Sequence, residues 1–384
     1  MAALVLLDLS AAFDTVDHSI LLQRLHLTFG IDDTAHRWFH SYLSFRKQYV
    51  RRGSSRSSTT YLVCGVPQGS VLGPILFVLY TVDLLSVIER HGLSPHMYAD
   101  DTQLYGSCRP SAVSSFMSHV AHCAEAATSW MRSNRLQPNP DKTEVLWCAT
   151  ARRQHQLPAL PLVIDGCSIS PVRSARNLGI YIDCDLSMRA HVKHTVSRCF
   201  AALRQLRQIR HSLPTATLQM LVVALVHSRL DYGNSVLVGL PTYLTRQLQS
   251  VLNAAARMIY RLRTSDHITD ALISLHWLRV PERIHYKMAT LTYKALHGGA
   301  PRYLSSLVRV TDLSGRRALR SAGTSRLLVT PFKLSTVGGR AFPVAAAHIW
   351  NRLPDNVTSA TSLSTFQIQL KLTLFQQSFP DIIL

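Results

Sequence analysis

The first 186 residues alternate between short apolar runs, which predict strands, and longer segments with helical periodicity. Residues 2–7 form a continuous apolar run that ends at Asp8, which indicates a buried strand. Asp17 is placed to cap a helix carrying Ile20, Leu21, Leu22 and Leu25. Further helices are expected near residues 33–43 and over residues 111–133, where apolar side chains recur on one face.

Between these helices, several short segments predict turns and hairpins. Residues 96–105, HMYADDTQLY, alternate about Asp100 and Asp101, and LVIDGCSI contains Asp-Gly, a strong hairpin signal. YLVCGVPQGSVLGPILF predicts a strand, a turn and a helix with Pro74 in its first turn. NPDKTEVLWC predicts a turn into a strand, ARNLGIYID one more strand, and RRGSSRSSTT a polar, basic loop. Strands and helices alternating around hairpins favour an α+β fold.

From about residue 188 the pattern becomes mainly helical. Helices are predicted at 188–210, 215–230, 241–262 and 281–297. The last stretch, 300–384, mixes short apolar runs that suggest strands with a terminal helix near 362–377. We therefore expect a domain boundary near residue 187.

Charge divides at the same place. Residues 1–186 carry 16 Lys and Arg against 15 Asp and Glu, whereas residues 187–384 carry 25 against 7. Arginine supplies 34 of the 41 basic residues, and its planar guanidinium suits phosphate. The second part is expected to bind a polyanion, most simply nucleic acid. A solvated basic surface is the alternative.

Cysteines and apolar segments bear on the compartment. The seven cysteines form no C-x-x-C pair, which disfavours a disulfide framework or a zinc module and fits a reducing environment. MAALVLLDLS lacks the basic start of a signal peptide. VLGPILFVLYTVDLLSVIER has the apolarity of a membrane span, but it contains Asp83 and a Gly-Pro break and is predicted to be a buried helix. We expect an intracellular protein of the nucleus, the cytoplasm or both, neither secreted nor membrane-bound.

Asp100 and Asp101 stand side by side in an apolar run. Adjacent carboxylates in apolar surroundings are costly unless a cation relieves their repulsion. If the strand that ends at Asp8 neighbours this hairpin, three carboxylates meet at one edge of the sheet. Mg²⁺ ions held there, two of them roughly 3.5–4 Å apart, would suit phosphoryl transfer. Taken alone, an Asp-Asp pair is more typical of a solvated turn.

Five segments follow one another along the chain in this order: LVLLDLSAAFD, GVPQGSVLGPILF, YADD, NPDKTEVLW and NLGIYID. This set resembles the reverse transcriptases of non-LTR (LINE-type) retrotransposons, most of all the jockey-like elements of vertebrates. The resemblance covers nearly the whole chain, most specifically residues 1–186 and more loosely the segment GRAFPVAAAHIWNRLPDNV. It implies a polymerase palm over 1–186, an antiparallel sheet with helices on one face. A basic helical thumb over 187–299 and a C-terminal extension over 300–384 would follow.

The resemblance implies an RNA-directed DNA polymerase that adds deoxynucleotides to a primer 3′-hydroxyl by a two-metal reaction. The cofactor would be Mg²⁺, with Mn²⁺ as a substitute, and the partners an RNA template, a DNA primer and dNTPs. The resemblance assigns roles to the residues that match the family motifs: metal ligands Asp8, Asp100 (the preferred second ligand) and Asp101; Lys142 facing the triphosphate; Phe13 as a gate against the ribose 2′-hydroxyl; Gln68, Gly69 and Tyr98 near the nucleotide and primer end; and Leu178, Gly179 and Ile180 as a primer grip. Without the motifs, Phe13 is equally well explained by core packing and Lys142 by a solvated turn.

The chain departs from the family at its start, because only seven residues precede Asp8. A fingers region precedes this aspartate in the family, so we expect an N-terminally truncated, element-derived fragment. A catalytically inactive nucleic-acid-binding remnant of the same fold is the main alternative. An RNA-dependent RNA polymerase is the third, and Phe13 argues against it.

Overall fold

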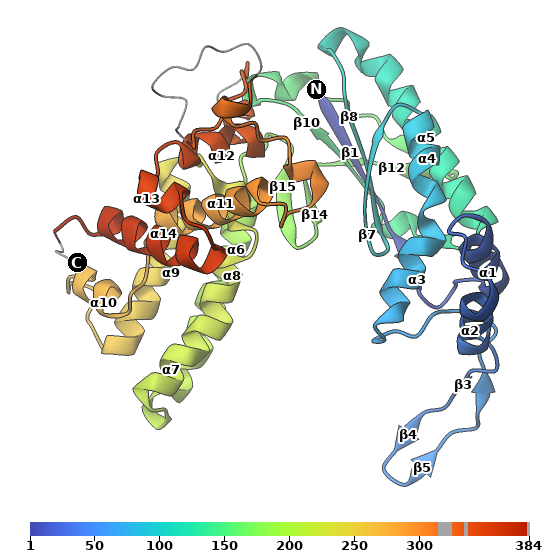
Figure 1. The fold of residues 1–384 in the computed structure, drawn as a ribbon, viewed down its shortest axis with the longest axis horizontal. Coiled ribbons are helices and arrows are strands. Elements are labelled where there is room, and N and C mark those ends of the chain that lie inside the picture. Colours follow the sequence, from blue (N-terminus) through green and yellow to red (C-terminus); the bar gives the residue numbers. More distant parts are fainter. Residues whose placement is uncertain (314–324, 334–336, 382–384) are drawn as a thin grey trace. The chain divides into compact units, whose positions relative to one another are not determined.

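The computed structural model describes residues 1–313, 325–333 and 337–381 (Figure 1). The chain separates into two compact units, Met1–Leu186 and Ser187–Leu384, called here the first and second units. The first contains a sheet with helices and the second is mainly helical, which confirms a mixed helix-and-strand fold.

The first unit is built around a five-stranded sheet with the order β13-β10-β1-β8-β7. The strands are β1 (Ala2–Leu7), β7 (Ser94–Tyr98), β8 (Asp101–Ser107), β10 (Glu144–Cys148) and β13 (Pro171–Val172). All neighbouring pairs are antiparallel except β10 and β13, which run parallel. β1 lies at the centre because it is apolar throughout and pairs along both edges.

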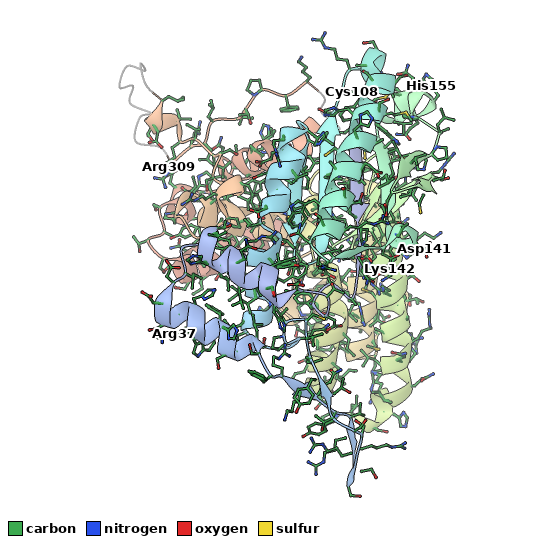
Figure 2. The ribbon with its side chains drawn as sticks, turned by 90° about the vertical axis from the view of Figure 1, so that its right-hand side faces the viewer. Arg37, Cys108, Asp141, Lys142, His155 and Arg309 are labelled. Carbon is green, nitrogen blue, oxygen red and sulfur yellow. The ribbon has the colours of Figure 1, made fainter. Side chains whose placement is uncertain are left out.

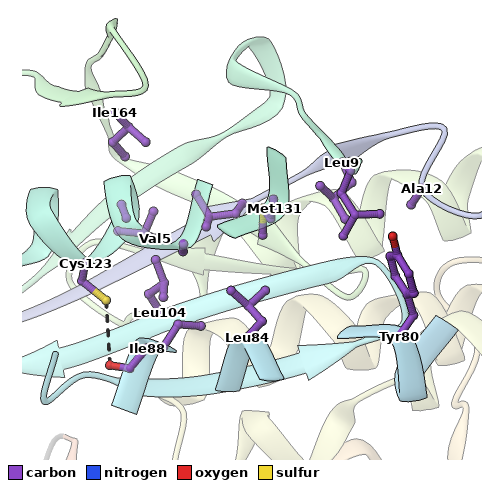
Figure 3. Close-up of a cluster of buried hydrophobic side chains, with 14 of the residues drawn as sticks. Val5, Leu9, Ala12, Tyr80, Leu84, Ile88, Leu104, Cys123, Met131 and Ile164 are labelled. Carbon is purple, nitrogen blue, oxygen red and sulfur yellow. Dashed lines mark hydrogen bonds between the residues drawn. The ribbon is translucent and has the colours of Figure 1, made fainter. Parts of the chain in front are cut away.

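Helices cover one face of this sheet (Figure 1). They are α1 (His18–Leu27), α2 (Asp33–Leu43), α3 (Leu72–Thr81), α4 (Asp83–Arg90) and α5 (Val113–Ser133). Alternation along β1 turns Ala3, Val5 and Leu7 into the core beneath them. Figure 3 shows Val5 and Leu104 from the sheet packed against Ile88, Cys123 and Met131 from the helices. The Cys123 thiol donates to the Ile88 carbonyl across 4.0 Å.

The long apolar segment belongs to this core. Leu72–Arg90 is the one stretch in the described part of the chain that is long and apolar enough to cross a membrane by length and composition. Leu76, Phe77, Tyr80, Leu84 and Ile88 are nevertheless no more than 1% exposed within the first unit. The Tyr80 hydroxyl also donates to the carbonyl of Asn134 at 2.6 Å. One face of the segment is therefore buried in the core, while Ile75 and Val78 on the other face are about half exposed, and the predicted single helix is two consecutive helices.

A β-hairpin covers the other face of the sheet. Ala2, Leu4 and Leu6 of β1 pack against the cluster that contains Ala175 of β14 (Ser174–Asn177), and so does Ile182 of β15 (Ile180–Asp183). The pattern of ARNLGIYID predicted one strand, which was wrong. Leu178 and Gly179 take positive φ angles of 45° and 83° and reverse the chain between two strands.

Other elements of the first unit lie close to their predicted positions. Asp17 accepts hydrogen bonds from the amides of Ser19 and Ile20 and caps α1, as expected. The hairpin of residues 96–105 turns at Ala99 and Asp100, so that Asp101 already begins β8. The Asp-Gly hairpin joins β11 (Leu162–Ile164) to β12 (Cys167–Ile169), and short β2 (Leu9–Ser10) pairs with β9 (Gln137–Pro138).

The segment predicted as a basic loop is instead a β-ribbon. β3 (Lys47–Gln48) pairs with β6 (Thr60–Tyr61), and β4 (Arg51–Arg52) pairs with β5 (Ser55–Arg56). In Figure 1 this ribbon extends from the end of α2 away from the sheet. We call residues 46–61 the basic arm.

The second unit consists of helices: α6 (Arg189–Ile209), α7 (Thr215–Val222), α8 (Ser228–Asp231), α9 (Thr242–Tyr260), α10 (Thr269–Ser274), α11 (Val280–Leu296), α12 (Phe342–Trp350), α13 (Asp355–Thr358) and α14 (Leu363–Ser378). The helix predicted at 215–230 is α7 and α8 joined by a π-helical turn. Phe366 of α14 stacks on Tyr293 of α11 and on Trp350 of α12, so residues beyond 300 share one core with α11. Strands were expected there, but the described residues after 300 contain only one bridge, between Arg309 and Leu327.

Candidate active site

The strand register brings three charged side chains into one row. Leu7 pairs with Thr102 of β8, and Leu6 pairs with Glu144 of β10. Continuing the β1–β8 register by one residue places Asp8 opposite Asp101, and continuing the β1–β10 register by two residues places it opposite Lys142. Directly opposed residues of antiparallel strands point to the same face, with Cβ atoms about 4.5–5.5 Å apart. Two carboxylates and an ammonium group therefore meet at the end of the central strand.

These side chains line a small cavity of about 90 Å³. Asp8, Asp101 and Lys142 form its wall together with Glu144, Arg176 and Leu178. Because a water molecule occupies about 30 Å³ of liquid volume, the cavity has room for a few waters or ions but not for a nucleotide.

The electrostatics of the cavity indicate a shortage of positive charge. Burial, and then the carboxylates of Asp100 and Asp8, raise the pKa of Asp101. Oδ2 of Asp8 is buried and accepts no hydrogen bond, and the Lys142 ammonium lies 3.6 Å from it, beyond hydrogen-bonding distance. A buried carboxylate oxygen without a hydrogen bond is costly unless a cation approaches it.

Asp8 and Asp101 fit a divalent cation. Mg²⁺ binds through one or two carboxylates and completes its shell with waters and substrate phosphates. Within the described ranges, no group of three or more His, Cys, Asp or Glu side chains is close enough to form a ready-made metal site. Asp101 lines the cavity together with Asp8, and Asp100, the preceding residue of the turn, lies close enough for its carboxylate to raise the pKa of Asp101.

The β14–β15 hairpin closes the cavity from above the sheet. The side-chain amides of Gln103 and Asn177 exchange two hydrogen bonds, of 2.8 and 3.0 Å, which tie β8 to β14. Leu178, the next residue, reaches the cavity wall, whereas Gly179 and Ile180 continue the turn into β15. The tip of this hairpin is thus held next to the carboxylates.

A second cluster, called here the glycine cluster, forms around Gly65 where the chain leaves the sheet. The Gly65 amide donates to the carbonyl of Val16, and Val66 donates to that of Phe13, both at 2.8 Å. The Gln68 amide donates to both oxygens of Asp14, at 3.2 and 3.3 Å. Gly65 has φ +88°, and a Cβ there would meet the Asp14 carbonyl oxygen at 3.0 Å, so the close approach requires glycine.

Known proteins with similar sequences decide the family. The family described as "Reverse transcriptase (RNA-dependent DNA polymerase)" matches residues 2–182, which lie wholly in the first unit. These residues are a reverse transcriptase domain.

Relatives of this reverse transcriptase domain come from insect mobile elements. A probable RNA-directed DNA polymerase from transposon BS of Drosophila melanogaster is 32% identical, over 58% of this chain and 24% of that protein. The RNA-directed DNA polymerase from mobile element jockey of Drosophila funebris is 28% identical, over 48% and 20%. One from transposon X-element of Drosophila melanogaster is 27% identical, over 66% and 28%. The predicted kinship with non-LTR elements is confirmed, and the chain spans about a quarter of the length of these relatives.

Solved structures offer a weaker comparison. Telomerase from Candida albicans, solved with a fragment of telomeric RNA, has a TM-score of 0.37 and 12% identity, over 71% of this chain and 49% of that one. A likeness at this level supports no argument about the chain described here.

The structure distributes the predicted site residues of the reverse transcriptase domain over two places. Asp8, Asp101, Lys142 and Leu178 line the cavity, with Asp100 and Tyr98 beside it in the same hairpin. Phe13 and Gln68 lie in the glycine cluster, with the Phe13 ring 4.8 Å from that of Phe77. Gly69 has φ +80° and open space around it.

Four of the lining residues with charged or amide side chains were missed from the sequence: Gln103, Glu144, Arg176 and Asn177. Two of them had a local signal. Gln103 lies two positions after Asp101, and Glu144 two positions after Lys142, and alternate residues of a strand share a face. Arg176 and Asn177 had none, because their segment was taken for a single strand.

Proposed function

We propose that the reverse transcriptase domain catalyses RNA-templated addition of deoxynucleotides to the 3′-hydroxyl of a DNA primer. The observation that supports this is the row formed by Asp101, Asp8 and Lys142 at the end of the central strand. Two partly buried carboxylates with a neighbouring cation suit the binding of divalent metal and phosphate, which is what phosphoryl transfer requires.

In this proposal, Asp8, Asp100 and Asp101 would hold Mg²⁺, or Mn²⁺ as a substitute, with Asp100 as the preferred second ligand. When bound, the metal lowers the pKa of the primer hydroxyl and neutralises the triphosphate. Asp100 adds negative potential next to Asp101. Lys142 keeps Asp8 partly neutralised until substrate arrives, then faces the triphosphate and donates a proton to the pyrophosphate that leaves.

Nucleotide selection is assigned to the glycine cluster. Phe13 packs against Phe77 and is only partly buried, so its ring is held in place while one side stays accessible. A fixed ring at this position would exclude a ribose 2′-hydroxyl. Gln68, oriented by Asp14, and Gly69 would contact the incoming nucleotide. Tyr98, 63% exposed, and the Leu178–Gly179–Ile180 turn would position the primer end.

The remaining assignments follow the family. We assign the palm to residues 1–186, the thumb to 187–299 and a C-terminal extension to 300–384. The excess of 25 basic over 7 acidic residues after position 186 supports contact with the template–primer backbone. Copying of element RNA in the nucleus or cytoplasm is the proposed role.

A primer-extension assay tests the activity. Purified chain, primed RNA, dNTPs and Mg²⁺ should give extension, which Asp101→Asn and Asp8→Asn should each abolish. Asp141→Asn is the matched control, because Asp141 precedes Lys142 in the same turn but is exposed and outside the cavity (Figure 2). A chain that binds primed RNA without extending it would instead be the inactive binding remnant.

A nucleotide-choice assay separates a DNA polymerase from an RNA polymerase. The unmodified chain should incorporate dNTPs in preference to rNTPs, and Phe13→Ala should reduce that preference. If the unmodified chain prefers rNTPs, or if Phe13→Ala leaves the ratio unchanged, the gate is not Phe13.

A further inference from the structure

The basic arm is the most exposed ordered part of the first unit. Every residue from 47 to 61 is exposed, and the ribbon continues through hydrogen bonds from Ser57 to Val50 and from Leu62 to Arg46, both 2.9 Å. Gly53, with φ +60°, makes the turn at its tip. Such a ribbon has no core of its own, so its composition is free to serve contact with a partner.

The arm concentrates positive charge without compensation. It carries Arg46, Lys47, Arg51, Arg52 and Arg56, and no Asp or Glu occurs between residues 34 and 82. The net charge of residues 1–186 is close to zero, so it does not reveal this local excess of positive charge. Arg46 donates to the Gly65 carbonyl at 3.0 Å, whereas the other four cations lie on exposed residues farther along the ribbon.

The ribbon's register sets like charges against each other. Arg51 pairs directly with Arg56 across the strands at the tip. Like charges in this position destabilise a ribbon, unless an anion lies between them. A negatively charged partner at the tip would relieve this repulsion.

Aromatic rings and backbone groups hold these cations in place. The Arg56 guanidinium lies 3.5 Å from the centre of the Tyr49 ring, and the Lys47 ammonium lies 4.8 Å from that of Tyr61. Nε of Arg51 donates to the Gly53 carbonyl at 3.2 Å. Since the cations cover one face of each tyrosine, the rings serve to orient charge more than to stack on unpaired bases.

We propose that the basic arm binds double-stranded DNA, with the ribbon in the major groove and its arginines on the flanking phosphates. The major groove of B-form DNA, about 12 Å wide, admits a two-stranded β-ribbon. The deep, narrow major groove of A-form RNA does not. The arm is thus a duplex-DNA contact separate from the carboxylate cavity and from the charge of the second unit.

The test compares two variants of the whole chain that lose the same charge. The arm variant is Arg51→Gln/Arg52→Gln/Arg56→Gln, and the control is Arg109→Gln/Arg152→Gln/Arg153→Gln. The control arginines are exposed and flank Cys108 and His155, which lie at the opposite end of the first unit from Arg37 of α2 (Figure 2). Binding of a labelled DNA duplex is followed by fluorescence anisotropy in EDTA without nucleotides, so the result does not depend on polymerase activity.

Counterion release sets the expected size of the effect. Each phosphate contact contributes about 0.9 to the steepness with which log K falls as log salt concentration rises. Loss of three arginines should therefore make this slope shallower by about 3 and weaken binding at least about tenfold at low salt. The control variant should bind as the unmodified chain does. Equal slopes for the arm and control variants would overturn the proposal.

Trypsin supplies an independent readout, because it cleaves after the arm's own arginines. DNA duplex should slow cleavage after Arg51, Arg52 and Arg56, and an RNA duplex of the same sequence should not. Protection by single-stranded RNA or by the RNA duplex, equal to that by DNA, would overturn the assignment to B-form DNA.

Discussion

Replacing Gln103 with methionine tests whether one amide pair holds the β14–β15 hairpin over the carboxylates. Gln103 is only 6% exposed and exchanges two hydrogen bonds with Asn177, which precedes the hairpin tip. Methionine keeps the length of the side chain but loses both polar groups. Each neutral hydrogen bond contributes about 0.5–1.5 kcal/mol net, so the pair contributes about 1–3 kcal/mol.

This loss should appear as faster local opening of the hairpin. Hydrogen exchange of the amides in residues 174–183 should accelerate about 5- to 150-fold, which is what 1–3 kcal/mol corresponds to. Exchange in α14, in the other unit, serves as the internal control. Primer extension should need more primer to reach half its rate, because the Leu178 turn is less firmly held.

A second substitution separates the hydrogen bonds from general packing. Gln103→Met/Asn177→Leu removes both partners and leaves no amide unpaired, so it should cost less than the two single changes together. If Gln103→Met leaves hairpin exchange within about twofold of the unmodified chain, packing of Ala175 and Ile182 holds the hairpin and the reasoning fails.

Three further outcomes follow from the described contacts. The pKa of Asp101 is raised in the folded chain, so its contribution to stability is present at low pH and is lost as the pH rises. Asp101→Asn should therefore stabilise the chain at pH 7 while abolishing primer extension. Mg²⁺ should raise the melting temperature of the unmodified chain and leave that of the variant unchanged. Gly65→Ala should lower the free energy of unfolding by at least about 1–2 kcal/mol and remove most of the extension rate. Gly69→Ala, whose added Cβ meets no neighbouring atom, should lower the stability less in a thermal melt. Equal losses of stability would contradict the close approach of Gly65 to Asp14. Burial, and then Arg283, lower the pKa of His227 from 6.5 to about 4. The free energy of unfolding of the second unit should therefore fall by up to about 3 kcal/mol as the pH falls from 6.5 to 4. His227→Leu should remove most of this pH dependence, and a variant with an unchanged pH profile would argue against the role of His227.

Local sequence determined most elements of the first unit. The apolar run before Asp8, the cap at Asp17 and the Asp-Gly turn each act over a few residues, and each is found where it was predicted. Their causes are periodicity, capping and turn geometry, which need no distant partner. The same local reasoning failed at ARNLGIYID and at the basic arm, where Leu178 and Gly53 turn the chain within segments taken for a strand and a loop.

The sequence also predicted the residue types of the site, because the five motifs that contain them occur in the order typical of the family. Which of them meet was decided by tertiary structure. Strand register sets Asp8 between Asp101 and Lys142. Gln103 and Asn177, 74 positions apart, pair only because the Gln103 side chain points to the face of the sheet that the hairpin covers. Side chains that do not interact locally acquire partners through strand pairing, and the free energy that selects a register comes from burying the whole apolar face of β1.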